Sequence, residues 1–194
     1  WTRGYWTDLT CRLLQIALVA WMVLKTYRKP TDALGLPCAR WTTDLAVGCL
    51  VAAVCGAAVF GARWALASAG QGDLFDRLGI RGGGMGYGGR VRWSALLMAG
   101  VGPLAEDLFF WGVLYNGLRR TQSFLKAAAW VGLPYILLHA SPGGSLLALV
   151  QPAVGTLFFA ALFEWRRYIL TTLPVHASAN LAILLINRGV VFTV

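Results

Sequence analysis

Two acidic side chains, Glu106 and Asp107, lie next to each other in a stretch that is otherwise apolar enough to cross a membrane. An acidic residue at the centre of a spanning helix costs about 2.5–3.5 kcal/mol, so it needs a partner, a water-filled cavity or a proton. Neighbouring side chains on an α-helix point about 100° apart, so we expect the two carboxylates to face different surroundings. The pair therefore predicts two different roles for the two acids.

The chain contains 2 histidines, His139 and His176, and both lie in or at the edge of apolar segments. Asn180 follows His176 by four residues, a spacing that puts both side chains on one face of a helix. Together with Glu106 these residues make a set of polar groups on separate predicted helices, and each would be costly to expose to lipid. The simplest arrangement that satisfies them all is a cluster in the protein interior.

Such a cluster contains the groups of a hydrolytic site. A carboxylate in a low-dielectric pocket can act as a general base on water, and a neighbouring imidazole can share the proton. A second imidazole and an amide N–H can donate hydrogen bonds to a developing oxyanion. Each residue alone also has a structural interpretation, because intramembrane His and Asn side chains often form interhelical hydrogen bonds. His139 can equally be interfacial, and we interpret Asp107 as a supporting acid that fixes a partner.

The composition indicates an integral membrane protein that forms one domain, 1–194. Hydrophobic residues make up 58% of the chain and the mean hydropathy is +0.63, both above the range of ordinary soluble domains. The 17 Lys and Arg residues give a net charge of +9, but they lie mainly between apolar segments. That distribution favours anionic lipid headgroups over nucleic acid as the partner.

The first residue is not Met, and we expect the natural chain to begin further upstream.

Hydrophobic length predicts about six spanning helices in a polytopic all-α bundle. They cover about 9–27, 45–69, 93–118, 123–139, 145–165 and 168–186. Arg12, near the start of the first, is expected to snorkel to the membrane interface. The connection 70–92 is glycine-rich and contains a GxGxxG pattern, but no strand precedes it, so we interpret it as a loop. A second turn is predicted at 141–144.

Three short motifs follow one another on these apolar segments. They are Glu106-Asp107-xxx-Trp111, Tyr135-xxx-His139 and His176-xxx-Asn180. Their order resembles the CPBP family of CAAX prenyl endopeptidases and bacteriocin-processing enzymes, which are intramembrane glutamic proteases. The family motifs are Glu-Glu-xxx-Arg, Phe-xxx-His and His-xxx-Asn or Asp. The resemblance covers about residues 93–187, which we take as the motif-bearing core.

The resemblance implies catalytic roles for four of these residues. Glu106 would activate the hydrolytic water together with His139, while His176 and Asn180 would stabilise the oxyanion. It also implies a bacterial or archaeal cell membrane as the location.

The remaining motif residues, Asp107, Trp111 and Tyr135, are expected to support the site. Two of them depart from the family pattern. Asp107 is shorter than the usual second Glu, and Trp111 stands where the family has the Arg that would neutralise the acid pair. The aromatic residues are interpreted as packing or as a wall for an apolar substrate.

The sequence therefore predicts a multi-pass membrane peptidase that cleaves near the terminus of a lipidated or membrane-anchored protein or peptide, without cofactor or metal. A metalloprotease is one alternative, because Glu106, His139 and His176 could fill three zinc positions, although no HExxH motif is present. Two further alternatives are not enzymes: a non-catalytic immunity or scaffold factor, and a small transporter with a polar site at the membrane midplane.

Overall fold

The computed structural model describes residues 2–26, 35–36, 40–71, 74, 93–139 and 149–187, and every regular element in these ranges is helical. The predicted all-α class is confirmed. The elements are α1 (Thr2–Thr26), α3 (Trp41–Ser68), α5 (Trp93–Glu106), η2 (Asp107–Tyr115), α6 (Asn116–Leu118), α7 (Phe124–His139), α8 (Val150–Arg166) and α9 (Ile169–Asn187). The turn at 141–144 and most of the connection 70–92 lie outside the described residues.

Three described helical stretches are long and apolar enough to cross a membrane: Trp6–Lys25, Trp41–Ser68 and Leu97–Leu118. They correspond to the first three predicted spans. Phe124–His139 and Ile169–Leu185 are shorter apolar helices. The third span is 61% buried inside the protein, against 11% and 6% for the first two. The stretch that carries the acid pair is therefore the centre of the bundle.

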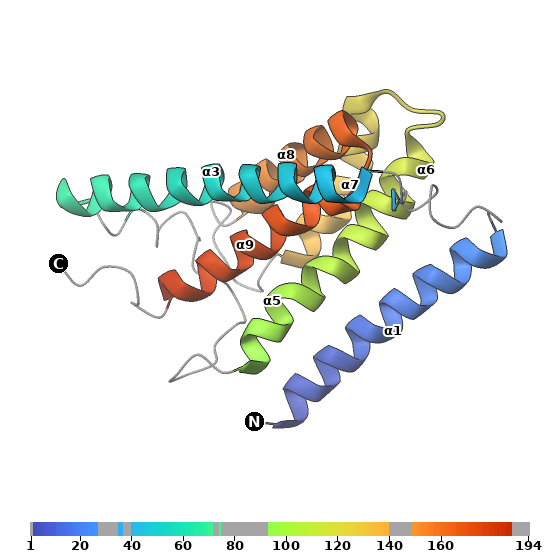
Figure 1. Ribbon diagram of the computed structural model, residues 1–194, viewed down its shortest axis with the longest axis horizontal. Helices are drawn as coiled ribbons and strands as arrows, with labels where there is room; N and C mark the ends of the chain where they lie inside the picture. The colour runs from blue at the N-terminus through green and yellow to red at the C-terminus, as the bar shows by residue number, and fades with distance from the viewer. Residues whose placement is uncertain are drawn as a thin grey trace.

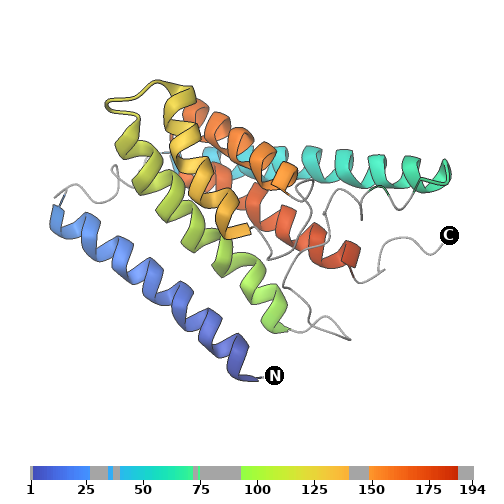
Figure 2. The same cartoon turned by 180° about the vertical axis from the view of Figure 1, so that it is seen from behind.

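The other helices surround this central stretch (Figures 1 and 2). α1 lies at one edge, beside α5 in both views, and α3 packs along α9 on the other side. α7 and α8 pack against each other and against η2. Bulky aromatic side chains around η2 form much of the hydrophobic core, among them Phe110, Trp111, Tyr115, Tyr135 and Phe163.

The predicted α-helix over 93–118 is interrupted by η2, which is π-helical from Asp107 to Tyr115. Its wide turns are seen at its end, where the Asn116 N–H donates to the Trp111 carbonyl five residues earlier. Glu106 is the last residue of α5, so the acid pair straddles the junction between the two helix types. π-helical segments are rare and occur frequently at functional sites.

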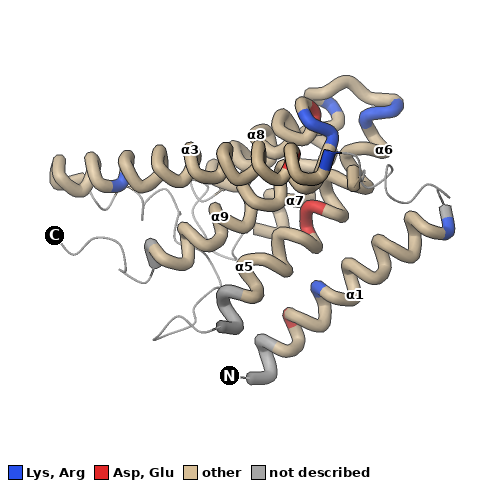
Figure 3. Tube along the Cα trace, in the orientation of Figure 1, with Lys and Arg blue, Asp and Glu red and all other residues tan. Residues whose placement is uncertain are grey.

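Charged residues gather at the end of the bundle where α6, α7 and α8 meet (Figure 3). Glu164 accepts hydrogen bonds from Arg119 at 2.7 and 3.0 Å and from Tyr115 at 2.8 Å. Arg166 reaches across to Asp44 of α3, with Nε 2.9 Å from Oδ1. These pairs join the ends of helices that are distant in sequence.

Close packing of α3 on α9 depends on Gly48. A Cβ at this position would lie 2.7 Å from the Thr171 carbonyl oxygen and 3.0 Å from Pro174 Cγ. We expect Gly48→Ala to lower the free energy of unfolding by about 1–3 kcal/mol, the usual cost of overpacking, as measured by thermal unfolding in detergent. Gly56→Ala on the same helix is the control, because its Cβ would meet nothing within 4 Å. Equal unfolding temperatures for the two variants would contradict the α3–α9 packing.

Candidate active site

The fully buried carboxylate of Asp107 is anchored to α9 by both of its oxygens. Oδ1 is 2.8 Å from His176 Nδ1, and Oδ2 accepts a hydrogen bond from Thr172 Oγ1 at 2.9 Å. An ionised carboxylate only accepts hydrogen bonds, so the hydrogen in the first contact belongs to Nδ1. In the neutral imidazole this tautomer leaves Nε2 as an acceptor.

Glu106 faces the other nitrogen of the same imidazole. Its Oε2 lies 3.7 Å from His176 Nε2, which is too long for a direct hydrogen bond. The two acids, which lie on different faces of their helix, both approach His176, each at its own ring nitrogen. The reason is that a flat ring from a second helix can insert between two side chains that diverge on their own helix.

Oε2 of Glu106 is buried and has no hydrogen-bond partner among the described residues. The great majority of buried acceptors in folded proteins have a partner, which can be an ordered water. An open carboxylate oxygen next to an imidazole nitrogen is thus a place suited to a water molecule or a substrate atom.

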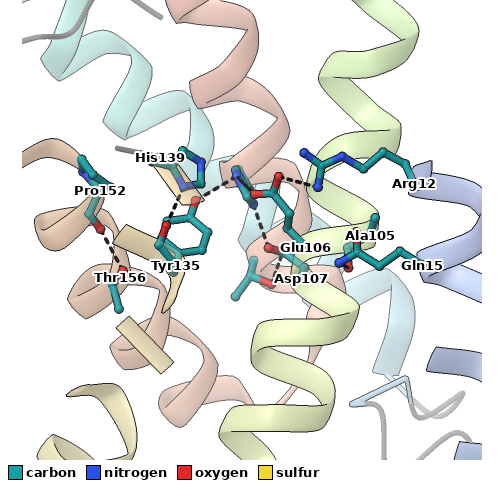
Figure 4. A network of polar contacts seen from close by, with 11 residues as sticks. Arg12, Gln15, Ala105, Glu106, Asp107, Tyr135, His139, Pro152 and Thr156 are labelled. Carbon is teal, nitrogen blue, oxygen red and sulfur yellow. Dashed lines mark hydrogen bonds and ion pairs between the residues drawn. The ribbon is translucent and has the colours of Figure 1, made fainter. Parts of the chain in front are cut away.

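The other oxygen of Glu106, Oε1, forms an ion pair with Arg12 Nη1 at 3.0 Å. The expectation that Arg12 snorkels to the interface is wrong, because its guanidinium turns inward from α1 to the buried acid (Figure 4). Gln15, one turn further along α1, donates from Nε2 to the Ala105 carbonyl at 3.4 Å. A signal for this contact was present in the sequence: Asp8, Arg12 and Gln15 recur at spacings that put them on one helical face.

Tyr135 links the imidazole of His176 to His139 (Figure 4). The Tyr135 hydroxyl is 3.4 Å from His176 Nε2, and the rings of Tyr135 and His139 stack with centroids 4.3 Å apart. His139 Nδ1 lies 2.8 Å from the Tyr135 backbone carbonyl and donates to it. His139 is exposed at the end of α7 and, although the structure describes both residues, forms no hydrogen bond or ion pair with Glu106.

Asn180 and Trp111 complete the predicted set. Asn180 is half-buried on α9, one turn beyond His176, and its side chain makes no hydrogen bond within the described ranges. Trp111 is completely buried among aromatic rings, and its indole N–H has no partner among the described residues. The positive charge that Trp111 lacks reaches the acid pair from Arg12 instead.

Zinc sites in proteins need at least three well-placed ligands. Within the described residues, no group of three or more His, Cys, Asp and Glu side chains is arranged to hold a metal ion. Of the three residues that could have formed a zinc site, Glu106 and His176 lie together and His139 does not join them.

The fold and this cluster define an α-helical membrane protein with an acid–imidazole site in its interior. Residues 89–182 match the family model described as Type II CAAX prenyl endopeptidase Rce1-like. This segment is just under half of the chain, and its match to the family model supports the predicted resemblance to CAAX proteases. The matched segment contains all three motifs but neither α1 nor α3. No curated protein and no solved structure was found to match the chain.

The anchoring of Asp107 can be tested with two adjacent threonines of α9, both fully buried. Thr172 donates to Asp107, whereas Thr171 Oγ1 has no partner among the described residues. We expect Thr172→Val to lower the free energy of unfolding by about 1–3 kcal/mol, because the buried carboxylate loses a donor. Thr171→Val, the matched control, should cost nothing. Chemical denaturation in detergent measures both, and a larger loss for Thr171→Val would refute the anchoring contact.

Proposed function

We propose that this protein is a multi-pass intramembrane peptidase of the glutamic type, in which Glu106 Oε2 takes a proton from the attacking water. The observation that supports the proposal best is the contrast between the two oxygens of Glu106. Oε1 is held by Arg12, whereas Oε2 is buried, unpartnered among the described residues and 3.7 Å from His176 Nε2. A carboxylate held in this way is suited to general-base catalysis.

The proposed water lies beside the line from Oε2 to Nε2, because hydrogen bonds of about 2.8 Å to both atoms fit a separation of 3.7 Å only in a triangle. Its oxygen attacks the peptide carbonyl carbon while its proton passes to Glu106. Collapse of the tetrahedral intermediate breaks the C–N bond, and Glu106 returns the proton to the leaving amine.

The oxyanion of the intermediate needs hydrogen-bond donors. Asn180 is our candidate, because its amide makes no hydrogen bond within the described chain. The resemblance also assigns His176 to the oxyanion, but its Nδ1–H is engaged with Asp107. With Nε2 as an acceptor, His176 fits better as the group that holds the water. We propose that His139, whose Nε2 has no hydrogen-bond partner among the described residues, contacts the substrate on the side of Tyr135 away from His176.

The match to the CAAX protease family supports a membrane-anchored or prenylated protein as the substrate. We propose that cleavage occurs near the terminus of such a protein or of a lipidated peptide. The apolar helices around the site suit a substrate whose anchor stays in the bilayer.

The first test replaces the proposed base. Glu106→Gln keeps size but cannot accept the proton, so cleavage of a prenylated reporter peptide in detergent should fall by a factor of about 10² to 10⁴. The variant should remain folded, because a neutral amide costs less to bury than a carboxylate. Asp107→Asn should reduce activity less, since its proposed role is to orient His176. A fully active Glu106→Gln together with an inactive Asp107→Asn would reverse the assignment of the two acids.

A second test concerns metal. Because His139 does not join Glu106 and His176, we expect protein treated with a strong chelator to retain its peptidase activity. Activity and bound metal are measured on the same sample by peptide cleavage and elemental analysis. Loss of activity that stoichiometric zinc restores would identify a metalloprotease and rule out the glutamic mechanism.

A further inference from the structure

We infer that Arg12, on α1, is a positioning residue for Glu106: its guanidinium fixes one carboxylate oxygen and thereby directs the other at His176. This inference rests on the proposed role of Glu106 as the base. Arg12 lies outside the segment that matches the family, 89–182, so family membership assigns it no role.

The local sequence leaves Glu106 without a cation of its own. No Lys or Arg occurs between residues 93 and 118, and the first one after them, Arg119, is engaged with Glu164. The ion pair with Arg12, at 3.0 Å, brings a positive charge to Oε1, and the same guanidinium lies 3.7 Å from Asp8 on its own helix. Arginine suits this task because it remains protonated and presents fixed donors to a carboxylate.

One face of α1 is built for this contact. Successive residues along this face are three or four positions apart: Arg12, Gln15, Val19 and Val23. Both valines are buried, at 3% and 1% exposure. The apolar half of the face packs in the core, while the polar half lies at the level of Glu106. An arginine within a membrane span is costly, so its position opposite an acid is informative.

Two polar contacts join α1 to α5 at and beside Glu106, both from the same side (Figure 4). Arg12 binds the tip of the side chain, and Gln15 binds the carbonyl of the preceding residue, Ala105. α1 sits at the edge of the bundle, beside α5 (Figure 1). The position of this peripheral helix thus sets the orientation of the proposed base. Small misplacements of a reacting group are expensive, since about 1 Å can cost about 10²-fold in rate.

Steady-state kinetics on the full chain test the positioning role. Arg12→Met should lower kcat by about 10- to 100-fold with little change in KM, because substrate binding is retained while the base is misplaced. Arg12→Lys should recover part of the loss, since it restores the charge without the planar fork. Lys25→Met removes a charge from the exposed far end of the same helix and should leave kcat unchanged. A wild-type kcat for Arg12→Met would overturn the inference.

Thermal unfolding gives a readout that needs no activity. With Glu106 present, Arg12→Met leaves a buried carboxylate without its cation and should lower the unfolding temperature. In a protein that already carries Glu106→Gln, the same change leaves no such carboxylate, so the unfolding temperature should fall much less. An equal effect in both backgrounds would overturn the pairing. If the wild-type protein cleaves no peptide, the proposed function and the kinetic role of Arg12 both fail, whereas the unfolding comparison still decides whether Arg12 neutralises Glu106.

Discussion

Two carboxylates buried side by side impose the constraint that the rest of this structure satisfies. Glu106 is 8% exposed and Asp107 is not exposed at all. Charges in a low-dielectric interior interact strongly, and an uncompensated one is very costly. Three of the four carboxylate oxygens have partners, His176, Thr172 and Arg12, on helices remote in sequence. These pairs fix α1 and α9 against the junction of α5 and η2, and the fourth oxygen, Oε2 of Glu106, has no hydrogen-bond partner among the described residues.

The packing of the surrounding helices holds α9, and with it the partners of Asp107, in place. α3 approaches α9 closely at Gly48, which holds the helix that carries Thr172 and His176. On the inner side, Phe159 lies against the His176 ring with centroids 4.9 Å apart, and Tyr135 reaches its Nε2. The imidazole is therefore held by an anchoring acid and by an aromatic wall that also limits the access of bulk water. A site with this support has its geometry in place before the substrate arrives.

The site is more extensive than the segment that identifies the family. The motifs lie within residues 89–182, yet the cation that pairs with Glu106 comes from α1. Trp111, in the family's Arg position, is instead a fully buried member of the aromatic core. The positive charge beside Glu106 therefore comes from a helix outside the matched segment.

The sequence by itself determined the all-helical class, the apolar spans, the acid pair and the motif order, because hydropathy and residue spacing are local properties. It could not reveal the π-helical turn after Glu106, the tautomer of His176 or the inward turn of Arg12. These depend on which helix faces which, and on groups brought together from about ninety residues apart. A lone arginine in a span has two low-energy solutions, snorkelling or pairing. Only the tertiary structure determines that Arg12 pairs with Glu106, because it places α1 beside α5.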